Sequence, residues 1–354
     1  MLFEPLQVGA LKLPNRILLA PLTRTRADLE HLPNDLMAEY YAQRASGGLL
    51  ITECTMVAPN TSAFMAEPGI YSDEQVQAWK KITSAVHAKG GRIFMQIWHP
   101  GRAAHPAING GAETVSSSAM AIEGEIYTPQ GKVPHAVPRA LRADEIPGIV
   151  AAFVQAAKNA IAAGFDGVEV HGANGYLIDQ FLRDGANKRT DAYGGSLENR
   201  ARFLIEVLTA VTAAIGADRV GLRLSPLNSY NSMIDSDPIG WIGALSERLS
   251  AFKLAYLHVM RADFFQKQTG DVMSVARAKY QGVLIGNMGY TPEEAEKAIS
   301  EGQLDAVAFG TAFLANPDLP ERIQAGAVLN TPNPDTFYTP GPEGYTDYPA
   351  MQAA

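Results

Sequence analysis

Eight short apolar runs, separated by helical patterns, constrain the fold of this chain more than any other feature. The runs are rich in Val, Ile and Leu and show no polar alternation, which is typical of strands buried on both faces. The expected strands span residues 17–20, 49–52, 93–97, 167–170, 220–224, 256–259, 283–286 and 306–309. Eight strand–helix units predict an α/β fold, the (β/α)₈ TIM barrel, with an open doubly wound sheet as the competing fold. A length of 354 residues fits a single barrel, so we expect one domain over residues 1–354.

Helix signals fill the gaps between these runs. Residues 144–164 repeat apolar side chains at helical spacing, and Gly164 ends the pattern. Ser72 with Gln75 predicts a capping box at the start of another helix. Thr291 is followed by a proline and two acids, which also predicts a helix start.

Two longer segments interrupt the alternation. Residues 99–143 follow the third expected strand and are rich in Gly, Pro and Ser. They predict a long capping loop or hairpin over the barrel mouth. Residues 327–354 carry many Pro, Gly and Tyr residues, and we expect them to wrap the surface.

Composition excludes several classes of function. The net charge of -8 and the pI of about 5.4 argue against binding to nucleic acid or to an anionic membrane. Cys54 is the only cysteine, which excludes an internal disulfide, a Cys-rich zinc site and an iron–sulfur cluster, and we expect no metal site. Residues 1–5 lack the pattern of a signal peptide, and no apolar run approaches the ~18 residues that span a bilayer. We expect a cytoplasmic protein, and the sequence leaves open whether it is a monomer or a homodimer.

The active site of a barrel lies where strands end and the following loops begin. The last two expected strands end in Asn287-Met288-Gly289 and in Phe309-Gly310-Thr311. Glycines let the backbone approach an anion closely, and free N–H groups at a helix start bind phosphate. Tight turns alone would also explain these glycines, but their place after strands seven and eight favours a phosphorylated ligand.

A polar cluster of His171, Asn174 and Tyr176 comes at the end of the fourth expected strand. A histidine and an asparagine amide can each donate a hydrogen bond to one carbonyl oxygen and stabilise the charge that develops on it. An unperturbed tyrosine has a pKa of about 10, so Tyr176 stays protonated at neutral pH and can act as a general acid. The alternative is a histidine satisfied within the core or a loop.

Three polar residues on other strands are candidates for ligand binding. Arg223 lies inside an apolar strand, where an unpaired charge is unfavourable. It needs an acidic side chain or an electron-rich ligand, such as a reduced flavin that is anionic near N1. Gln96 offers both a donor and an acceptor to a pyrimidine edge, and Thr23 offers a hydroxyl to a ring carbonyl or N5.

Aromatic side chains near the strand ends are candidate walls for a flat substrate, although each of them could instead pack in the core. They are Phe64, Trp98, Tyr176, Phe264 and Tyr338. Cys54 has no identifiable base beside it, so we interpret it as a small packing residue rather than a nucleophile.

Motifs from about residue 2 to residue 350 form one specific combination. They are Ala20-Pro21-Leu22-Thr23-Arg24, Gln96-Ile97-Trp98-His99 with Gly101-Arg102, the segment 171–176, Arg189-Thr190-Asp191, Tyr193-Gly194-Gly195-Ser196, Glu198-Asn199-Arg200, Asn316-Pro317-Asp318-Leu319 and Gly344-Tyr345-Thr346-Asp347-Tyr348-Pro349. The combination resembles the Old Yellow Enzyme family. The resemblance implies an FMN enzyme that is reduced by NADPH or NADH and then reduces activated carbon–carbon double bonds of small α,β-unsaturated carbonyl and nitro compounds.

The resemblance also implies roles for individual residues. His171 and Asn174 would hold the carbonyl or nitro oxygen of the substrate. Tyr176 would protonate the α-carbon after flavin N5 delivers hydride to the β-carbon. The implied cofactor-binding residues are Thr23 at O4, Gln96 at the pyrimidine edge, Arg223 at N1 and O2, and Pro21, Leu22, Cys54, Asn287, Met288, Gly289, Phe309, Gly310 and Thr311 along the rest of the cofactor.

This chain departs from the family pattern at three places. Thr311 stands where the family usually has an arginine that grips the FMN phosphate, so we expect weaker FMN retention or a replacement cation from elsewhere. Phe264 stands where close relatives often have a tryptophan, so we expect a different preference for the shape of the substrate. The Asn287-Met288 pair is not the usual pair of small residues.

Two other classes of function compete with the reductase. A flavin-free barrel lyase or aldolase would need a Schiff-base lysine or metal carboxylates at strand ends, and we find no lysine there. A flavin-binding protein without catalysis would not need the set of His171, Asn174 and Tyr176. The sequence specifies neither the physiological substrate nor the choice between NADPH and NADH.

Overall fold

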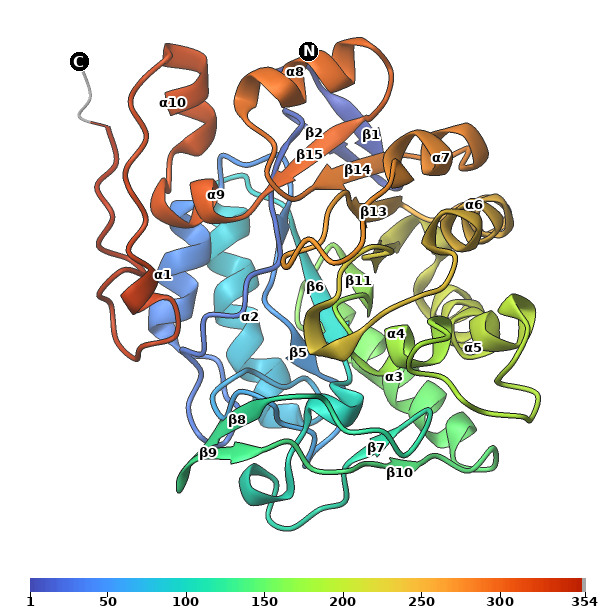
Figure 1. The fold of residues 1–354 in the computed structure, drawn as a ribbon. Coiled ribbons are helices and arrows are strands. Elements are labelled where there is room, and N and C mark those ends of the chain that lie inside the picture. The colour runs from blue at the N-terminus through green and yellow to red at the C-terminus, as the bar shows by residue number, and fades with distance from the viewer. Residues whose placement is uncertain (352–354) are drawn as a thin grey trace.

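The eight apolar runs form eight parallel strands that close into a barrel in the computed structural model, which describes residues 1–351 (Figure 1). Each strand pairs with the next one along the chain, and closure comes from the pairing of β15 with β3. The predicted barrel is therefore confirmed and the open doubly wound sheet is excluded. Residues 352–354, the end of the segment expected to wrap the surface, lie outside the described residues.

The strand positions agree with the sequence pattern to within two residues at each end. The barrel strands are β3 (Ile17–Leu19), β4 (Leu50–Ile51), β6 (Ile93–Trp98), β11 (Gly167–Gly172), β12 (Val220–Leu224), β13 (Tyr256–Met260), β14 (Leu284–Asn287) and β15 (Ala306–Phe309). Strand β11 is longer than expected, because its parallel register with β12 continues through His171 and Gly172. His171 therefore lies on the strand itself, directly beside Arg223.

Helices follow most of the strands and cover the outside of the barrel (Figure 1). They are α1 (Asp35–Gln43), α2 (Asp73–Ala88), α3 (Ile146–Ala162), α4 (Leu177–Leu182), α5 (Leu197–Ile215), α6 (Pro238–Leu249), α7 (Val272–Lys279), α8 (Pro292–Ser300), α9 (Thr311–Ala315) and α10 (Leu319–Ala325). The predicted capping box of Ser72 and Gln75 is present at the start of α2. Thr291 caps α8 in the same way together with Glu294. No helix in the described part of the chain is long and apolar enough to cross a membrane.

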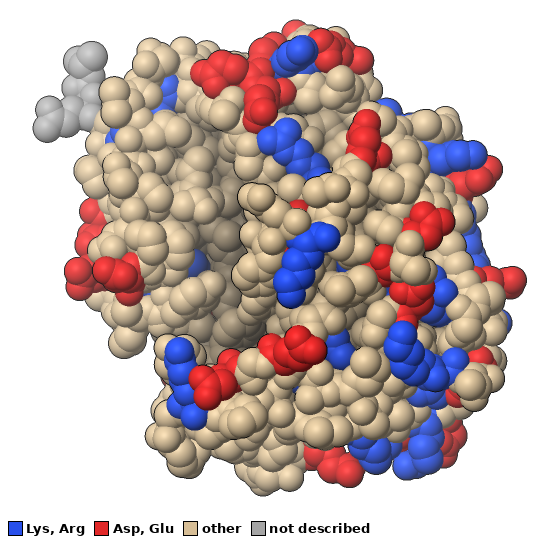
Figure 2. Space-filling model, in the orientation of Figure 1, with Lys and Arg blue, Asp and Glu red and all other residues tan. Residues whose placement is uncertain are grey.

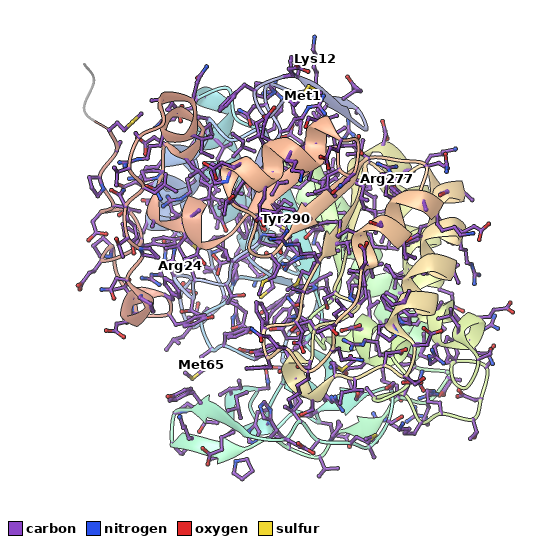
Figure 3. The ribbon with its side chains drawn as sticks, turned by 45° about the horizontal axis from the view of Figure 1, so that its top comes forward. Met1, Lys12, Arg24, Met65, Arg277 and Tyr290 are labelled. Atoms are coloured by element: carbon purple, nitrogen blue, oxygen red, sulfur yellow. The ribbon has the colours of Figure 1, made fainter. Side chains whose placement is uncertain are left out.

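The segment between β6 and α3 contains the expected hairpin. Strands β8 (Glu125–Thr128) and β9 (Gly131–Pro134) pair antiparallel, while β7 (Val115–Ser116) and β10 (Arg139–Ala140) pair parallel. The hairpin lies beside Met65 (Figure 3). The described residues also form three other short strands, namely β1 (Leu6–Val8), β2 (Leu11–Leu13) and β5 (Thr55–Met56).

The C-terminal segment is held against the barrel by arginines that follow β3 (Figure 3). The Arg24 guanidinium donates to the backbone carbonyls of Phe337 and Gly344 at 3.0 and 2.7 Å. The ring of Tyr345 is fully buried and stacks on Tyr40 with centroids 4.1 Å apart. This part of the chain therefore forms one wall of the barrel mouth rather than a loose tail.

A buried carboxylate supports the same junction. Glu53, which follows β4, accepts hydrogen bonds from the backbone N–H groups of Arg24 and Thr25 at 3.2 and 3.3 Å. Burial nevertheless raises the pKa of Glu53 to about 7, because desolvation outweighs these donors and the nearby charge of Arg24.

Candidate active site

A cavity of about 500 Å³ opens at the end of the barrel where the parallel strands finish, and it appears as a deep hollow in the surface (Figure 2). This volume is in the range of small-molecule and cofactor sites. Predicted site residues that line the cavity are Pro21, Leu22, Thr23, Phe64, Asn174, Tyr176, Arg223, Phe264, Asn287, Met288, Gly289, Phe309, Gly310, Thr311 and Tyr338. Four other predicted residues, Cys54, Gln96, Trp98 and His171, are buried next to these positions without lining the cavity.

Tyr176 is placed by the turn between β11 and α4, and its ring faces the cavity. It lies edge-on to the rings of His171 and Trp98, each with centroids 5.1 Å from its own. Burial raises the pKa of Tyr176 well above its ordinary value of 10. The phenol is therefore a proton donor across the physiological pH range.

His171 is neutral, and its hydrogen bonds assign its tautomer. The backbone N–H of Ala173 donates to Nδ1 at 3.2 Å, so Nδ1 is the acceptor and the proton is assigned to Nε2. Burial, together with the charge of Arg223, holds the pKa of His171 well below its ordinary value of 6.5. His171 can therefore act as a neutral hydrogen-bond donor through Nε2.

Asn174 is held in a left-handed backbone conformation with φ of 58°. Its side-chain Oδ1 accepts a hydrogen bond from Nδ2 of Asn228 at 2.9 Å. Its backbone N–H donates to Oγ of Ser225 at 2.8 Å. With Oδ1 engaged, the amide directs the Nδ2 donor of Asn174 to the cavity that this residue lines.

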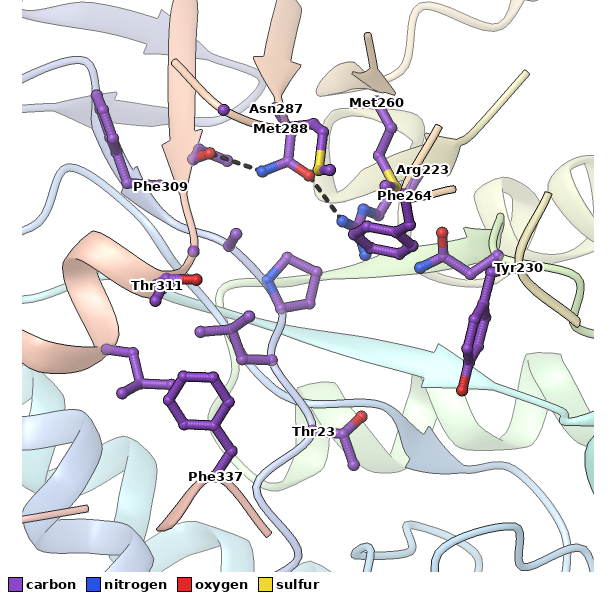
Figure 4. A pocket seen from close by; sticks show the side chains of 18 of the residues that line it. Thr23, Arg223, Tyr230, Met260, Phe264, Asn287, Met288, Phe309, Thr311 and Phe337 are labelled. Carbon is purple, nitrogen blue, oxygen red and sulfur yellow. Dashed lines mark hydrogen bonds between the residues drawn. The ribbon is translucent and has the colours of Figure 1, made fainter. Parts of the chain in front are cut away.

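Arg223 contacts an amide rather than an acid. Its Nη2 donates to Oδ1 of Asn287 at 2.8 Å, and Nδ2 of Asn287 donates to the backbone carbonyl of Ala308 at 2.7 Å (Figure 4). Burial lowers the pKa of Arg223 from its ordinary value, and the carboxylate of Glu169 opposes this effect only in part. The two side chains form no ion pair within 4.0 Å. Nε of Arg223 is buried and has no partner among the described residues.

Glu169 organises a polar network inside the barrel. One of its oxygens, Oε1, accepts from Nε2 of Gln96 at 2.8 Å, and Oε2 accepts from the hydroxyl of Tyr256 at 3.1 Å. Oε2 also lies 2.9 Å from Nδ1 of His258. The donor end of Gln96 is therefore engaged, which leaves its Oε1 as an acceptor.

Thr23 and Cys54 form a close pair at the ends of neighbouring strands. The Thr23 hydroxyl lies 3.2 Å from the Cys54 thiol, so the direction of the hydroxyl depends on this contact. Burial raises the pKa of Cys54 well above its ordinary value, which keeps the thiol protonated. This agrees with the interpretation of Cys54 as a packing residue.

The two glycine-containing strand ends meet on one side of the cavity. Gly289 has φ of 70°, a conformation that favours glycine, whereas Met288 adopts φ of 85° with a side chain. The backbone N–H groups of Gly289, Tyr290 and Thr311 donate to no acceptor within residues 1–351. Such free donors form a cradle for an anion.

One arginine lies beside this cradle: the Arg261 guanidinium donates to the backbone carbonyls of Met288 and Gly289 at 2.8 and 2.7 Å. Arg24 and Arg223 are the only cations that line the cavity in the described chain, and each already donates to other groups. The expectation of a replacement cation stays a prediction. The backbone cradle, the unpartnered Nε of Arg223 and the free acceptor of Gln96 nevertheless fit a phosphate and a pyrimidine edge, as FMN would require.

The aromatic walls are partly as expected. Phe64, Phe264 and Tyr338 line the cavity, whereas Trp98 is fully buried and packs edge-on against Tyr176. Sequence reasoning did not identify Tyr230, which joins this wall. It also did not identify Asn228, Ser225 and the partners of Glu169, because nothing in a local pattern shows which distant side chain a polar group will meet.

Comparisons with known proteins identify a family for this chain. The model of the NADH:flavin oxidoreductase / NADH oxidase family matches residues 1–330. A probable flavin mononucleotide-dependent alkene reductase from Leishmania infantum is 52% identical over 357 residues, covering 99% of this chain and 98% of that protein.

Two solved structures have the same fold. The old yellow enzyme from Trypanosoma cruzi is 45% identical, with a TM-score of 0.96 over 99% of both chains. Morphinone reductase in complex with tetrahydroNAD is also 45% identical, with a TM-score of 0.94 over 99% of this chain and 98% of that one. Because the family model and these relatives match nearly the whole barrel, the chain belongs to the NADH:flavin oxidoreductase / NADH oxidase family and is an FMN-dependent oxidoreductase homologous to the Old Yellow Enzymes.

Proposed function

We propose that residues 1–354 act as one FMN-binding domain that reduces activated carbon–carbon double bonds of small α,β-unsaturated carbonyl and nitro compounds, with NADPH or NADH as reductant. The observation that carries the proposal is the set of three donors at the barrel mouth: Nε2 of His171, Nδ2 of Asn174 and the hydroxyl of Tyr176. The alkene reductase name of the Leishmania relative supports the same reaction class.

His171 and Asn174 bind and polarise the substrate. Both present N–H donors whose direction is fixed by hydrogen bonds on the opposite side of the group. Two such donors on one carbonyl or nitro oxygen stabilise the negative charge that develops there as the double bond is reduced. Because His171 is neutral, it donates a hydrogen bond without transferring its proton.

Tyr176 supplies the proton that completes the reduction. Its raised pKa keeps the phenol protonated, and its position at the cavity allows transfer to the substrate α-carbon. Trp98 packs edge-on against the tyrosine ring, and Phe64 in turn packs against Trp98. Phe264 and Tyr338, with exposed fractions of 48% and 63%, form the outer wall against which a flat substrate would lie.

The cofactor residues divide between the two ends of the cavity. Arg223 and Thr23 line the ring end, with Gln96 buried next to it, and Gly289 and Thr311 line the phosphate end. When bound, FMN supplies hydride chemistry at N5. Backbone and side chains of Pro21, Leu22, Met288, Phe309 and Gly310 complete the contact surface, and Cys54 lies next to it against Thr23.

The test follows visible flavin absorption of the purified protein under anaerobic conditions, first with NADPH and then with 2-cyclohexenone. Bleaching by NADPH and recovery with the enone are the expected result. A protein that stays colourless with added FMN would overturn the cofactor assignment. A flavin that bleaches and is not reoxidised by the enone would favour a flavin-binding protein with another acceptor.

A barrel lyase is the alternative from another class. Among the residues that line the cavity there is no lysine for a Schiff base. No group of three or more His, Cys, Asp or Glu side chains in the described residues could hold a metal ion. Sugar-phosphate cleavage by a colourless protein would favour this alternative over the reductase.

A further inference from the structure

Asn287 connects three strands of the barrel below the cavity (Figure 4). It ends β14, and its side-chain amide reaches Arg223 on β12 in one direction and the backbone of Ala308 on β15 in the other. The exposed fraction of both Asn287 and Arg223 is only 6%. Two buried hydrogen bonds to fixed partners leave this amide a single orientation.

Glu169 is a second group that attracts Arg223. The carboxylate of Glu169 lies close enough to raise the pKa of Arg223, but it is not within 4.0 Å. In a low-dielectric interior, a guanidinium and a carboxylate attract each other strongly. Without a tether, Arg223 would move toward Glu169 and away from the cavity.

We propose that Asn287 is a positioning residue that holds Arg223 away from Glu169 and so keeps the guanidinium charge at the cavity, beside the flavin. The inference rests on the proposed function, in which Arg223 lies beside N1 and O2. In this role the Asn287 side chain acts through Arg223, because both polar ends of its amide are already engaged.

The physical consequence is a higher reduction potential for the bound flavin. A cation beside N1 stabilises the reduced, more negative form more than the oxidised form. The ratio of the two dissociation constants sets the potential, and a tenfold change in that ratio is about 30 mV for a two-electron couple. A purely structural residue would weaken both forms equally and leave the potential unchanged.

The experiment measures the midpoint potential of the FMN-loaded protein by spectroelectrochemistry. In Asn287→Ala we expect the preference for reduced flavin to fall about tenfold, which lowers the potential by about 30 mV. In the nearly isosteric Asn287→Asp we expect a larger decrease, because the new carboxylate neutralises Arg223. If both variants hold FMN and keep the wild-type potential, the inference is wrong.

A double-mutant cycle separates positioning from general damage. In an Arg223→Lys background, Asn287→Ala should cause no further decrease, because a lysine does not present the guanidinium that the amide holds. An equal decrease in both backgrounds would overturn the positioning role. Wild-type protein that binds no FMN would refute the proposed function itself. If the wild-type flavin is reduced by NADPH and reoxidised by the enone, but Asn287→Ala keeps the wild-type potential, only this inference is refuted.

Discussion

Nδ2 of Asn228 donates to Oδ1 of Asn174 at 2.9 Å, and this one contact decides which end of the Asn174 amide faces the substrate cavity. Asn228 itself is fixed, since its Oδ1 accepts from the backbone N–H groups of Tyr230 and Phe264. An asparagine in the substrate site is useful as a donor only in this orientation.

Asn228→Asp should reverse that orientation. The aspartate keeps both backbone acceptors but cannot donate to Asn174, so the amide turns its Nδ2 toward the new carboxylate. Loss of one donor to the substrate oxygen predicts a decrease of about tenfold in kcat/KM for 2-cyclohexenone, in line with the ~0.5–1.5 kcal/mol of a hydrogen bond. Steady-state kinetics on the FMN-loaded protein measures this value. An unchanged kcat/KM would mean that Asn174 does not act through its Nδ2.

His171→Ala should slow turnover of the enone by about 10²–10³-fold, as removal of a donor to a developing oxyanion does. His171→Gln is the matched control, because its amide restores an N–H donor and should recover part of the loss. Since burial holds the pKa of His171 well below 6.5, lowering the pH from 8 to 6 should leave its contribution intact. A rate that falls with a midpoint near pH 6.5 in wild type but not in His171→Gln would contradict the neutral assignment.

Tyr176→Phe should separate the two half-reactions. The phenylalanine keeps the edge-on packing against Trp98 but removes the proton donor. Reoxidation of reduced flavin by the enone should slow by about 10²–10⁴-fold, the range of general acid catalysis. Stopped-flow absorption at the flavin band measures each half-reaction. Full reoxidation rates with the variant would exclude Tyr176 as the acid.

Thr311→Arg should tighten FMN binding. Thr311 begins α9 at the phosphate end of the cavity, where the backbone supplies donors and the threonine side chain carries no charge. One charge-assisted hydrogen bond of about 1.5–3 kcal/mol corresponds to roughly ten- to hundredfold tighter binding. Titration with FMN and with riboflavin, which has no phosphate, provides the control. Equal tightening of both ligands would show that the effect does not involve the phosphate.

Glu53 should make stability depend on pH in a defined direction. Its pKa in the folded state is raised to about 7 from an ordinary value of 4.5, so its contribution is fully present below pH 4.5 and is lost as the pH rises through 7. Glutamine has the size of glutamate but cannot ionise. The free energy of unfolding of Glu53→Gln should therefore fall less between pH 5 and pH 8 than that of the wild type. Urea denaturation at several pH values measures the free energy of unfolding of both proteins. Parallel curves for wild type and variant would mean that Glu53 stays ionised throughout.

The sequence predicted the positions of the strands better than it predicted which side chains contact one another. Strands β12 and β15 were predicted with their observed ends, since an uninterrupted apolar run bounded by turns carries its own boundaries. The sequence left open whether Trp98 lines the cavity or packs in the core, and the structure buries it against Tyr176. A strand pattern fixes the level of a side chain in the barrel, but packing against its neighbours decides whether that side chain reaches open space.

By itself, the sequence determined the barrel and the placement of His171, Asn174, Tyr176 and Arg223 near one end of it. These follow from local periodicity and from the rule that parallel strands bring their carboxyl ends together. Only the tertiary structure decided which end of each amide faces the cavity and which group holds Arg223. Those answers depend on partners that lie 54 residues away for Asn174 and 64 residues away for Arg223. A hydrogen bond between such distant residues forms only after the strands have closed, so no local pattern encodes it.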